Sequence, residues 1–388
     1  MPSTPATPSR TGNIIAALAA VGACDIAFGL TLQLMPLLMD REGWPAWAIG
    51  LNVAMGPIGI LMAGPFLPKF LGNFGTKRAT LAVVVTLILS LALISVTPIW
   101  MWFPLRFIFG LSVSVLFTVS ETWILSFSTA ENRGRMMGLY TSLLAVTFAI
   151  GPLILPWTGI TGFLPWGIGI ACIIFSILPL LFVEVRDEDF RERDGGGFFG
   201  FVRKAPMLLF AVGAATLFDN VLISFFTIYG IRHGLELDVA SRILGFGIIG
   251  NVVLFYPMGL LADRWSRRGV MMVTAGMTVL LSLSLLVVIT HWLVWPVMMV
   301  LTGCAFGVYV VALATLGDRF NGPDLMAGAA AIAAMWGVGG LIGPPIAGAA
   351  IDAFGINAVP VTLASFYVLL LAGLALSGGR LVREDRLG

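Results

Sequence analysis

The sequence is short of charged residues. Of its 388 residues, 11% are charged and 59% are hydrophobic, whereas soluble domains carry about 25% charged residues. So few charged side chains cannot cover the surface of a water-soluble protein of this size. We therefore expect lipid to solvate most of the surface, with each membrane span built from about 20 apolar residues.

Histidine and cysteine are also scarce, with two and three residues. Cys24, Cys172 and Cys304 lie in separate apolar runs, without the spacing of a metal site or a disulfide framework. The sequence contains no H-E-x-x-H motif, no phosphate-binding glycine loop and no Ser/His/Asp cluster. A membrane-embedded enzyme is therefore disfavoured, and nothing points to a cofactor or a metal. The net charge of +2 indicates no nucleic-acid partner.

Long apolar runs separated by short polar connections predict an all-α integral membrane protein. The longest connection, 186–204, is dense in charge and contains the triple glycine Gly195–Gly197. We interpret it as a cytoplasmic linker between an N-terminal six-helix bundle, 1–185, and a C-terminal six-helix bundle with a short tail, 205–388. The twelve predicted spans are 13–38, 47–68, 79–97, 101–127, 135–157, 163–185, 205–230, 242–262, 270–290, 293–317, 326–352 and 356–378.

The placement of Lys and Arg predicts the orientation, because cytoplasmic connections carry an excess of both. Of the 22 Lys and Arg residues, Arg41, Arg232 and Arg242 fall in outer segments and Arg106 falls inside a span. All the others lie in segments that are cytoplasmic if both termini are cytoplasmic. We therefore expect both termini in the cytoplasm.

The two predicted halves repeat one another weakly. Short matching strings occur in the same order in each half, and the first two pairs keep the same spacing. Such a six-plus-six duplication is typical of many secondary transporters. The matched strings are Ala20–Ala23 with Ala211–Ala214, Arg41-Glu-Gly43 with Arg232-His-Gly234, and Ile150-Gly-Pro152 with Ile342-Gly-Pro344.

The connection after the eighth predicted span reads Gly259-Leu-Leu-Ala-Asp263-Arg264-Trp-Ser-Arg267-Arg268. It resembles the loop signature of the major facilitator superfamily, G-x-x-x-D-R-x-G-R-R/K, with Ser266 in place of the inner glycine. The strings WFPLRFIFG, SETWIL, ENRGRMMGLY and GDRFNGPDLMAG are similar to a bacterial subfamily broadly described as sugar or drug transporters. The resemblance covers nearly the whole chain.

The resemblance implies two pseudo-symmetric six-helix bundles that work by alternating access, and a cytoplasmic latch between them. In the family the acid of the signature faces the start of a helix in the other half, where the helix dipole attracts it. The implied latch comprises Gly259, Asp263, Arg264 and Arg267 with Arg133 and Arg135 of the fifth span. Alternatively, Asp263 only caps a turn on a solvated loop. In the first half Pro68 occupies the acid position, so the latch is expected on one side only.

Charged residues inside a span cost at least about 2.5–3.5 kcal/mol each, so they are candidate functional residues. Asp25 lies in the middle of the first span and Asp219, beside Asn220, in the middle of the seventh. We interpret both acids as candidate proton carriers or substrate contacts. The alternative for each is a structural hydrogen bond to a neighbouring helix.

The fourth span carries Arg106 and Glu121, which share one helix face. Fifteen residues place them roughly 22 Å apart, so they cannot pair. Arg106 is predicted to bind a substrate anion or a carboxylate on another span. Glu121 is the strongest candidate for proton coupling, because a buried carboxylate can take up and release protons near neutral pH. A structural tie between helices is the alternative for both.

Uncharged polar residues could complete a cavity between the halves. Gln33, Asn220 and Trp336 are predicted to contact substrate; weaker candidates are Asn52, Thr122, Asn251 and Tyr309.

The sequence thus predicts a secondary active transporter that moves a small organic solute across a bacterial cytoplasmic membrane, coupled to protons. Its expected partners are the solute, protons and the lipid bilayer, and we expect a monomer. Two alternatives remain. One is an efflux antiporter for drugs or metabolites with the same fold, and the other is a receptor-like member of the family that does not transport.

Overall fold

The computed structural model describes residues 10–127, 133–182, 198–320 and 322–376 of the chain. Within these ranges the chain folds into helices and short connections, with no β-strand. The first part comprises α1 (Arg10–Arg41), α2 (Ala46–Phe74), α3 (Thr76–Val96), a 3-10 turn η1 (Ile99–Met101), α4 (Trp102–Phe127), α5 (Arg133–Thr158) and α6 (Leu164–Phe182). The second comprises α7 (Phe198–Lys204), α8 (Pro206–Arg232), α9 (Leu237–Arg264), α10 (Arg267–Val288), α11 (Val294–Arg319), α12 (Gly322–Phe354) and α13 (Ala358–Leu376).

Each predicted span coincides with one long helix. Nine of the described helices are long and apolar enough to cross a membrane, and two more contain shorter apolar segments, Ser142–Thr158 and Leu164–Leu178. In lipid every backbone N–H and C=O must be satisfied within the protein, and a helix achieves this inside one segment. The largest differences from the prediction are at two helix ends. Helix α2 continues past residue 68 to Phe74, where Gly75 with φ of 74° ends it, and α9 begins at Leu237 instead of residue 242.

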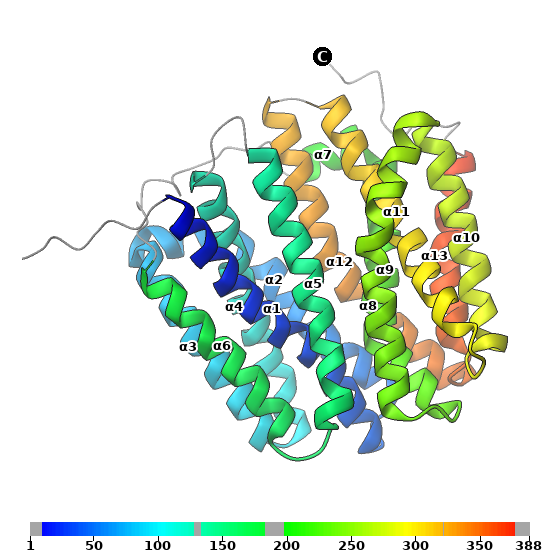
Figure 1. Ribbon diagram of the computed structural model, residues 1–388, viewed down its shortest axis with the longest axis horizontal. Helices are drawn as coiled ribbons and strands as arrows, with labels where there is room; N and C mark the ends of the chain where they lie inside the picture. The colour runs from blue at the N-terminus through cyan, green and yellow to red at the C-terminus, as the bar shows by residue number, and fades with distance from the viewer. Residues whose placement is uncertain (1–9, 128–132, 183–197, 321, 377–388) are drawn as a thin grey trace, which may run out of the picture.

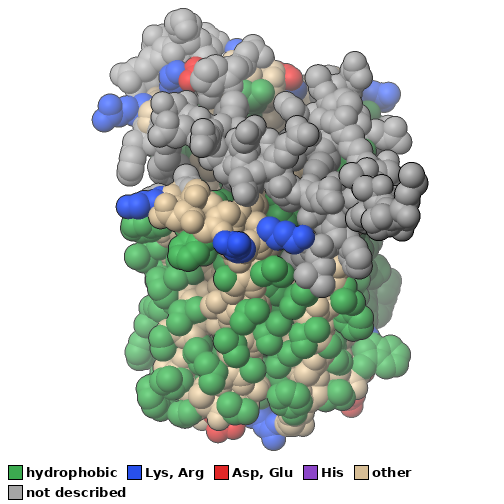
Figure 2. Space-filling view, turned by 90° about the vertical axis from the view of Figure 1, so that its left-hand side faces the viewer, with side chains coloured by type: hydrophobic (Ala, Val, Ile, Leu, Met, Phe, Trp, Pro, Cys, Tyr) green, Lys and Arg blue, Asp and Glu red, His purple; other side chains and the backbone are tan. Residues whose placement is uncertain are grey.

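The outward faces of the helices are apolar. Figure 2 shows hydrophobic side chains covering the lower part of one side, with most of the visible Lys and Arg above this band. On α3 the exposed apolar residues include Val85, Leu89 and Leu93, and on α6 they include Phe175 and Leu178. A surface of this kind is stable in hydrocarbon and not in water, which fits a multi-pass membrane protein.

The helices pack as two sets that meet along three seams (Figure 1). Helices α1–α6 contact one another, as do α8–α13, and we call these sets the N-half and the C-half. The seams between the halves are formed by α2 with α12, α5 with α9, and α1 with α8. The short helix α7 packs on α12 and α8, and its Lys204 forms an ion pair with Asp324 at 2.7 Å. The division of the chain at 186–204 stays a prediction, since residues 183–197 lie outside the described ranges.

The predicted repeat is visible in the turn that ends the first helix of each half. Gly43 and Gly234 both have positive φ, 78° and 90°. Gly43 N donates to Asp40 O, and Gly234 N donates to Ile231 O, the matching atom of the second half. These turns lie at the end of the bundle that the charge pattern assigns to the outside, which we call the outer end.

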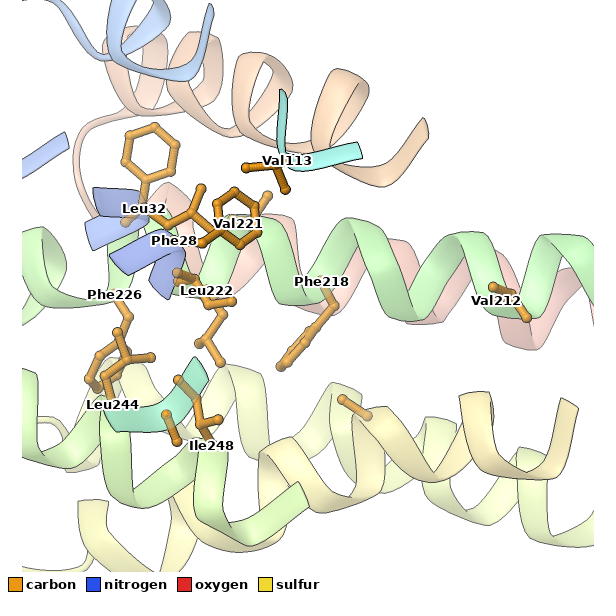
Figure 3. Packing of buried hydrophobic residues seen from close by; sticks show 14 of the residues in the cluster. Phe28, Leu32, Val113, Val212, Phe218, Val221, Leu222, Phe226, Leu244 and Ile248 are labelled. Atoms are coloured by element: carbon orange, nitrogen blue, oxygen red, sulfur yellow. The ribbon is translucent and has the colours of Figure 1, made fainter. Parts of the chain in front are cut away.

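One hydrophobic cluster runs through both halves. Figure 3 shows part of it, where Phe28 and Leu32 of α1 lie beside α8, and Phe226 of α8 faces Leu244 of α9. The seam between α2 and α12 is especially close, since a Cβ placed on Gly50 would lie 2.2 Å from Pro344 O. Small residues permit such an approach between membrane helices.

Candidate transport site

Asp25 is buried between α1 and α5 inside the N-half, with 3% of its surface exposed. The Thr147 hydroxyl of α5 donates to Asp25 Oδ2 at 2.7 Å. The two backbones approach closely next to this bond, because a Cβ on Gly29 would lie 2.4 Å from Phe148 O. Asp25 therefore has a hydrogen-bond partner inside the N-half, a contact that agrees with either of the two roles considered for it.

Asp219 lies at the middle of α8 and is 6% exposed. Within the described part of the chain its carboxylate has no hydrogen bond or ion pair. It lies near enough to Tyr367 of α13 to act on that hydroxyl electrostatically, but the hydroxyl donates to Ala305 O at 2.7 Å. The adjacent Asn220 donates to Thr216 O of its own helix at 2.9 Å. Of the two predicted mid-span acids, Asp219 is thus the one with no hydrogen bond or ion pair to the described residues.

Arg106 of α4 is 4% exposed and contacts only neutral groups among the described residues. Its Nη1 donates to Asn52 Oδ1 of α2 at 3.1 Å and lies 3.4 Å from Met35 Sδ of α1. No carboxylate of the described residues pairs with it. The prediction of a carboxylate on another span is therefore not met in this conformation, and the buried guanidinium is left with an amide as its main acceptor.

A small cavity adjoins Arg106 between α1, α2, α3 and α4. Its volume is about 10 Å³, and Phe28, Thr31, Met35 and Phe109 line it together with Arg106. That volume suits about one water molecule. A larger group could reach the guanidinium only after the helices had moved.

Gln33 and Trp336 lie in the seams between the halves. Gln33 is 1% exposed, and its Nε2 lies 2.6 Å from Thr227 Oγ1 of α8 and 3.0 Å from Ser241 Oγ of α9. Trp336 of α12 meets Phe148 of α5 edge to face, with ring centroids 6.5 Å apart. Both residues are therefore placed where a change in the relative position of the halves would alter their surroundings.

Glu121 differs from its prediction, because its side chain is exposed rather than buried. Along the shared face of α4 the side chains become more accessible toward the predicted cytoplasmic end, from Val113 at 5% exposure to the half-buried Phe117 and then Glu121. Glu121 is close enough to Tyr140 of α5 and Tyr309 of α11 to act on both electrostatically. Glu121 thus lies close to both halves, but it is not buried as predicted from the sequence.

The arginines of the loop signature have contacts within the C-half. Arg267 forms an ion pair with Asp318 of α11, and Arg268 Nη2 donates to Leu374 O of α13 at 3.2 Å. Ser266, which stands at the glycine position of the signature, caps α10 by accepting a hydrogen bond from Gly269 N at 2.9 Å. These contacts bind the loop to its own half.

The latch between the halves stays a prediction. Arg264 is exposed, and a Cβ on Gly259 would find open space. The side chains of Asp263, Arg133, Arg135 and Pro68 lie outside the described part of the structure.

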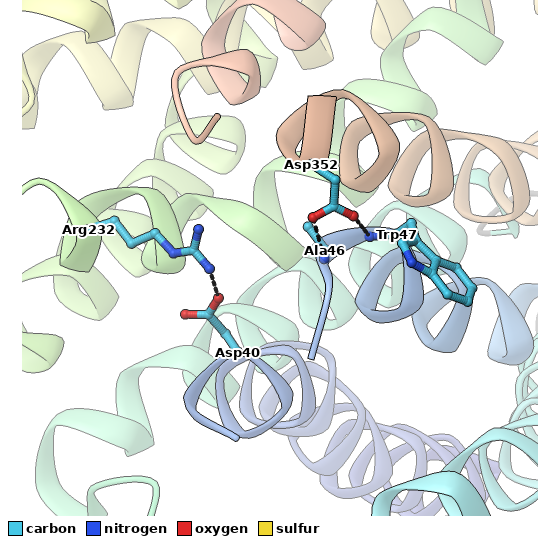
Figure 4. A network of polar contacts seen from close by, with 5 residues as sticks. All are labelled: Asp40, Ala46, Trp47, Arg232 and Asp352. Carbon is cyan, nitrogen blue, oxygen red and sulfur yellow. Dashed lines mark hydrogen bonds and ion pairs between the residues drawn. The ribbon is translucent and has the colours of Figure 1, made fainter. Parts of the chain in front are cut away.

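Three charged residues at the outer end make contacts that the sequence did not predict. Asp40 of α1 forms an ion pair with Arg232 of α8. Asp352 of α12 accepts hydrogen bonds from Ala46 N at 3.0 Å and Trp47 N at 2.8 Å, at the start of α2 (Figure 4). Asp40 and Arg232 flank the repeated turn, which could have drawn attention to them. Nothing in the sequence around Asp352 indicates its partner.

Two sets of apolar helices, with isolated charged side chains at the centre and polar contacts where the sets meet, define a multi-pass membrane transporter. The chain belongs to the Major Facilitator Superfamily, whose family model matches residues 17–327 and 208–385. Members of this family are transporters and not enzymes.

Relatives and solved structures agree with this assignment. The chain is 28% identical over 368 residues to the MFS-type transporter YfkF of Bacillus subtilis (strain 168), covering 89% of this chain and 91% of YfkF. It is 24% identical over 362 residues to the MFS-type transporter YcaD of Salmonella newport (strain SL254), with the same coverage. Among solved structures, the nucleoside transporter NupG matches with a TM-score of 0.75 at 15% identity, covering 96% of this chain and 99% of NupG. An inward-facing bacterial homologue of the lysosomal transporter Spinster matches with a TM-score of 0.76 at 13% identity, covering 99% of each chain. At these identities the two structures show the fold.

Proposed function

We propose that the protein is a proton-coupled secondary transporter that carries a small organic solute across the bacterial cytoplasmic membrane by alternating access. The observation that carries the proposal is Asp219, a carboxylate in the middle of a membrane helix with no partner among the described residues. An ionised carboxylate without a partner is very costly in apolar surroundings. Such a group is expected to hold a proton while the site is closed and to release it when water enters.

The exposed Glu121 supports the proposal because protons can reach it. It lies 15 residues beyond Arg106 on α4, toward the predicted cytoplasmic end and next to Tyr309 of the C-half. A carboxylate that is open to one side in this conformation can exchange protons with that side. In the proposal, Asp219 and Glu121 therefore both carry protons, one closed off and one accessible.

Solute contacts are assigned to residues at the seams and beside the buried charges. Trp336 and Asn220 come from the C-half, and Arg106 and Asp25 come from the N-half. Gln33 also belongs to this set, although its amide nitrogen already contacts Thr227 and Ser241. The similarity in fold to a nucleoside transporter favours a small polar organic molecule as the solute.

The same proposal places both termini in the cytoplasm and treats one chain as the working unit. Reporter fusions at each terminus test the orientation, and the mass of the purified protein in detergent tests the monomer.

Two experiments in sequence test the transport proposal. A thermal-shift screen of the purified protein against small metabolites and drugs identifies the solute, because a ligand that binds only the folded state raises stability. Accumulation of that solute is then measured in proteoliposomes with an imposed proton gradient. We expect Asp219→Asn and Glu121→Gln to abolish gradient-driven accumulation while solute exchange across the membrane survives.

Asp238→Asn is the matched control, since Asp238 pairs with Arg242 on its own helix α9 at 3.4 Å. Undiminished accumulation in both Asp219→Asn and Glu121→Gln would refute proton coupling through these residues. The direction of proton flow separates the two transport modes, because exchange of solute for protons indicates the efflux antiporter.

A further inference from the structure

The outer end of the molecule contains a helix cap that comes from the opposite half. Ala46 N and Trp47 N in the first turn of α2 both donate to the carboxylate of Asp352, which lies near the end of α12. Figure 4 shows the two oxygens of Asp352 facing the start of α2. The residues joined in this way are 306 and 305 positions apart in the chain.

The first turn of a helix needs such a partner. Its N–H groups have no acceptor within the helix, and the helix dipole places partial positive charge there, so a carboxylate is favoured. In most helices the preceding residue supplies the acceptor. Here that residue is Pro45, which makes no side-chain cap. Asp352 therefore satisfies donors of the N-half with an acceptor of the C-half.

Two further polar contacts between the halves lie on the same side of the molecule. Asp40 pairs with Arg232 at the ends of α1 and α8. Gln33, two turns deeper on α1, contacts Thr227 and Ser241. Next to the cap itself, a Cβ on Gly348 would lie 2.1 Å from Ala46 O, so the two backbones are in contact. The outer end is thus closed by the backbone contact between α2 and α12, together with the polar contacts of Asp352, Asp40 and Gln33.

Among the described residues, no matching cap is found at the start of α9. Continuing the match of Gly151 with Gly343 along the chain places Ile160 opposite Asp352, and isoleucine has no acceptor. At the start of α9 the preceding Glu236 makes no side-chain cap, and Val239 N is satisfied by Asp238 of the same helix at 2.8 Å. In the described part of the chain, the cap between halves is therefore found in the α2–α12 seam, whereas the start of α9 has a local contact at Val239 N instead.

We propose that Asp352 is an outer latch, which stabilises the conformation closed to the outside by capping α2 across the seam. Opening toward the outside separates α12 from α2, leaves the first turn of α2 without its acceptor and separates Asp40 from Arg232. The latch is independent of the transported solute and of proton coupling. It can therefore be tested without knowing the substrate.

The test measures how often the outer end opens. A cysteine at Leu37 serves as the probe in full-length protein whose three native cysteines are replaced by alanine. Leu37 is 3% exposed and lies one turn from both Gln33 and Asp40 on the same face of α1. A membrane-impermeant maleimide is added outside intact cells, and the rate of labelling reports the fraction of open molecules. A cysteine at the exposed Trp100 provides the labelling rate of an open site.

We expect Asp352→Ala to raise the labelling rate of the Leu37 cysteine about fivefold, the effect of removing a capping side chain worth about 1 kcal/mol. Asp352→Asn should raise it less, because an amide oxygen still accepts one of the two hydrogen bonds. Asp238→Ala is the matched control: it removes another outer acid whose ion pair stays within one half, and it should leave the rate unchanged.

An unchanged labelling rate in Asp352→Ala would overturn the proposal. So would an equal increase in Asp238→Ala, because a general effect of surface charge would then explain both. If Asp352→Ala does not reach the membrane, Asp352→Asn decides the question, with the rate for the Trp100 cysteine confirming that the reagent reached the protein.

Discussion

Replacing Gly348 by alanine should force the outer seam apart. A Cβ at this position would lie 2.1 Å from Ala46 O, 2.7 Å from Ala46 C and 2.9 Å from Trp47 Cα, all backbone atoms of the other half. An ordinary carbon–oxygen contact is about 3.4 Å or more, so α2 and α12 must separate by about 1.3 Å. Overpacking of this kind destabilises the closed conformation by about 1–3 kcal/mol. The ratio of open to closed molecules should therefore rise by about 5- to 150-fold.

Gly64→Ala is the matched control. Gly64 lies on an exposed part of α2, and a Cβ there would find nothing within 4 Å. Both substitutions replace glycine by alanine inside a helix, which removes the same conformational penalty of about 0.5–1 kcal/mol. The difference between the two variants therefore isolates the contact across the seam.

Hydrogen exchange followed by mass spectrometry measures the effect, since amides exchange when their region opens. In Gly348→Ala, we expect peptides that contain Ala46 and Trp47 to exchange at least about fivefold faster than in Gly64→Ala, the lower limit of the overpacking range. Peptides from the middle of α8 should exchange equally in both variants. Equal exchange at the start of α2 in the two variants would refute the reasoning, because the contact would then have been relieved without separating the halves.

Three further substitutions test single contacts by thermal unfolding in detergent. Thr147→Val removes the donor to Asp25 Oδ2 and should destabilise the protein by about 1–3 kcal/mol, whereas a change below about 0.5 kcal/mol would show that Asp25 does not depend on this bond. Asn52→Ala removes the oxygen that accepts a hydrogen bond from the buried Arg106 and should lower the stability by about 2–3 kcal/mol. Asn251→Ala is the control, because Asn251 Oδ1 has no partner among the described residues. An equal loss of stability in both variants would contradict the role of Asn52 as the acceptor. Lys204→Met breaks the ion pair with Asp324, in which the Lys204 and Asp324 side chains are 33% and 44% exposed. We therefore expect a loss of stability below about 1 kcal/mol. A larger loss would mean that α7 depends on this pair.

Much of the fold could be predicted from apolar length alone, because a membrane helix must satisfy its backbone within one segment. The twelve predicted spans coincide with twelve long helices, and the repeated glycine at 43 and 234 marks the same turn in both halves. The predicted end of α2 is too early, since residues 69–74, with Lys69 and Asn73 among them, continue the helix until Gly75 adopts positive φ.

The site was less predictable, because its contacts depend on which helices meet. Asp25 and Asp219 look alike in the sequence, yet one meets Thr147 of α5 and the other meets no partner among the described residues. The exposure of Glu121 could not be predicted from the apolar run around it. It depends on how closely the helices of the two halves pack at the predicted cytoplasmic end. The role of Asp352 requires a partner 306 residues away, which no local pattern encodes.

The ion pair between Asp40 and Arg232 also marks a difference between the two halves. In the repeat, Arg41 corresponds to Arg232, and Asp40 corresponds to Ile231. Two identical halves bearing Asp-Arg at this turn would meet through two such pairs, related by the symmetry of the assembly. Among the described residues this chain has one such pair, and Ile231 stands where the second acid would be. One pair can suffice in a single polypeptide, because two tethered halves do not need to recognise each other among other molecules. Ile231→Asp would add the second acid at the position that matches Asp40, with Arg41 at the position that matches Arg232.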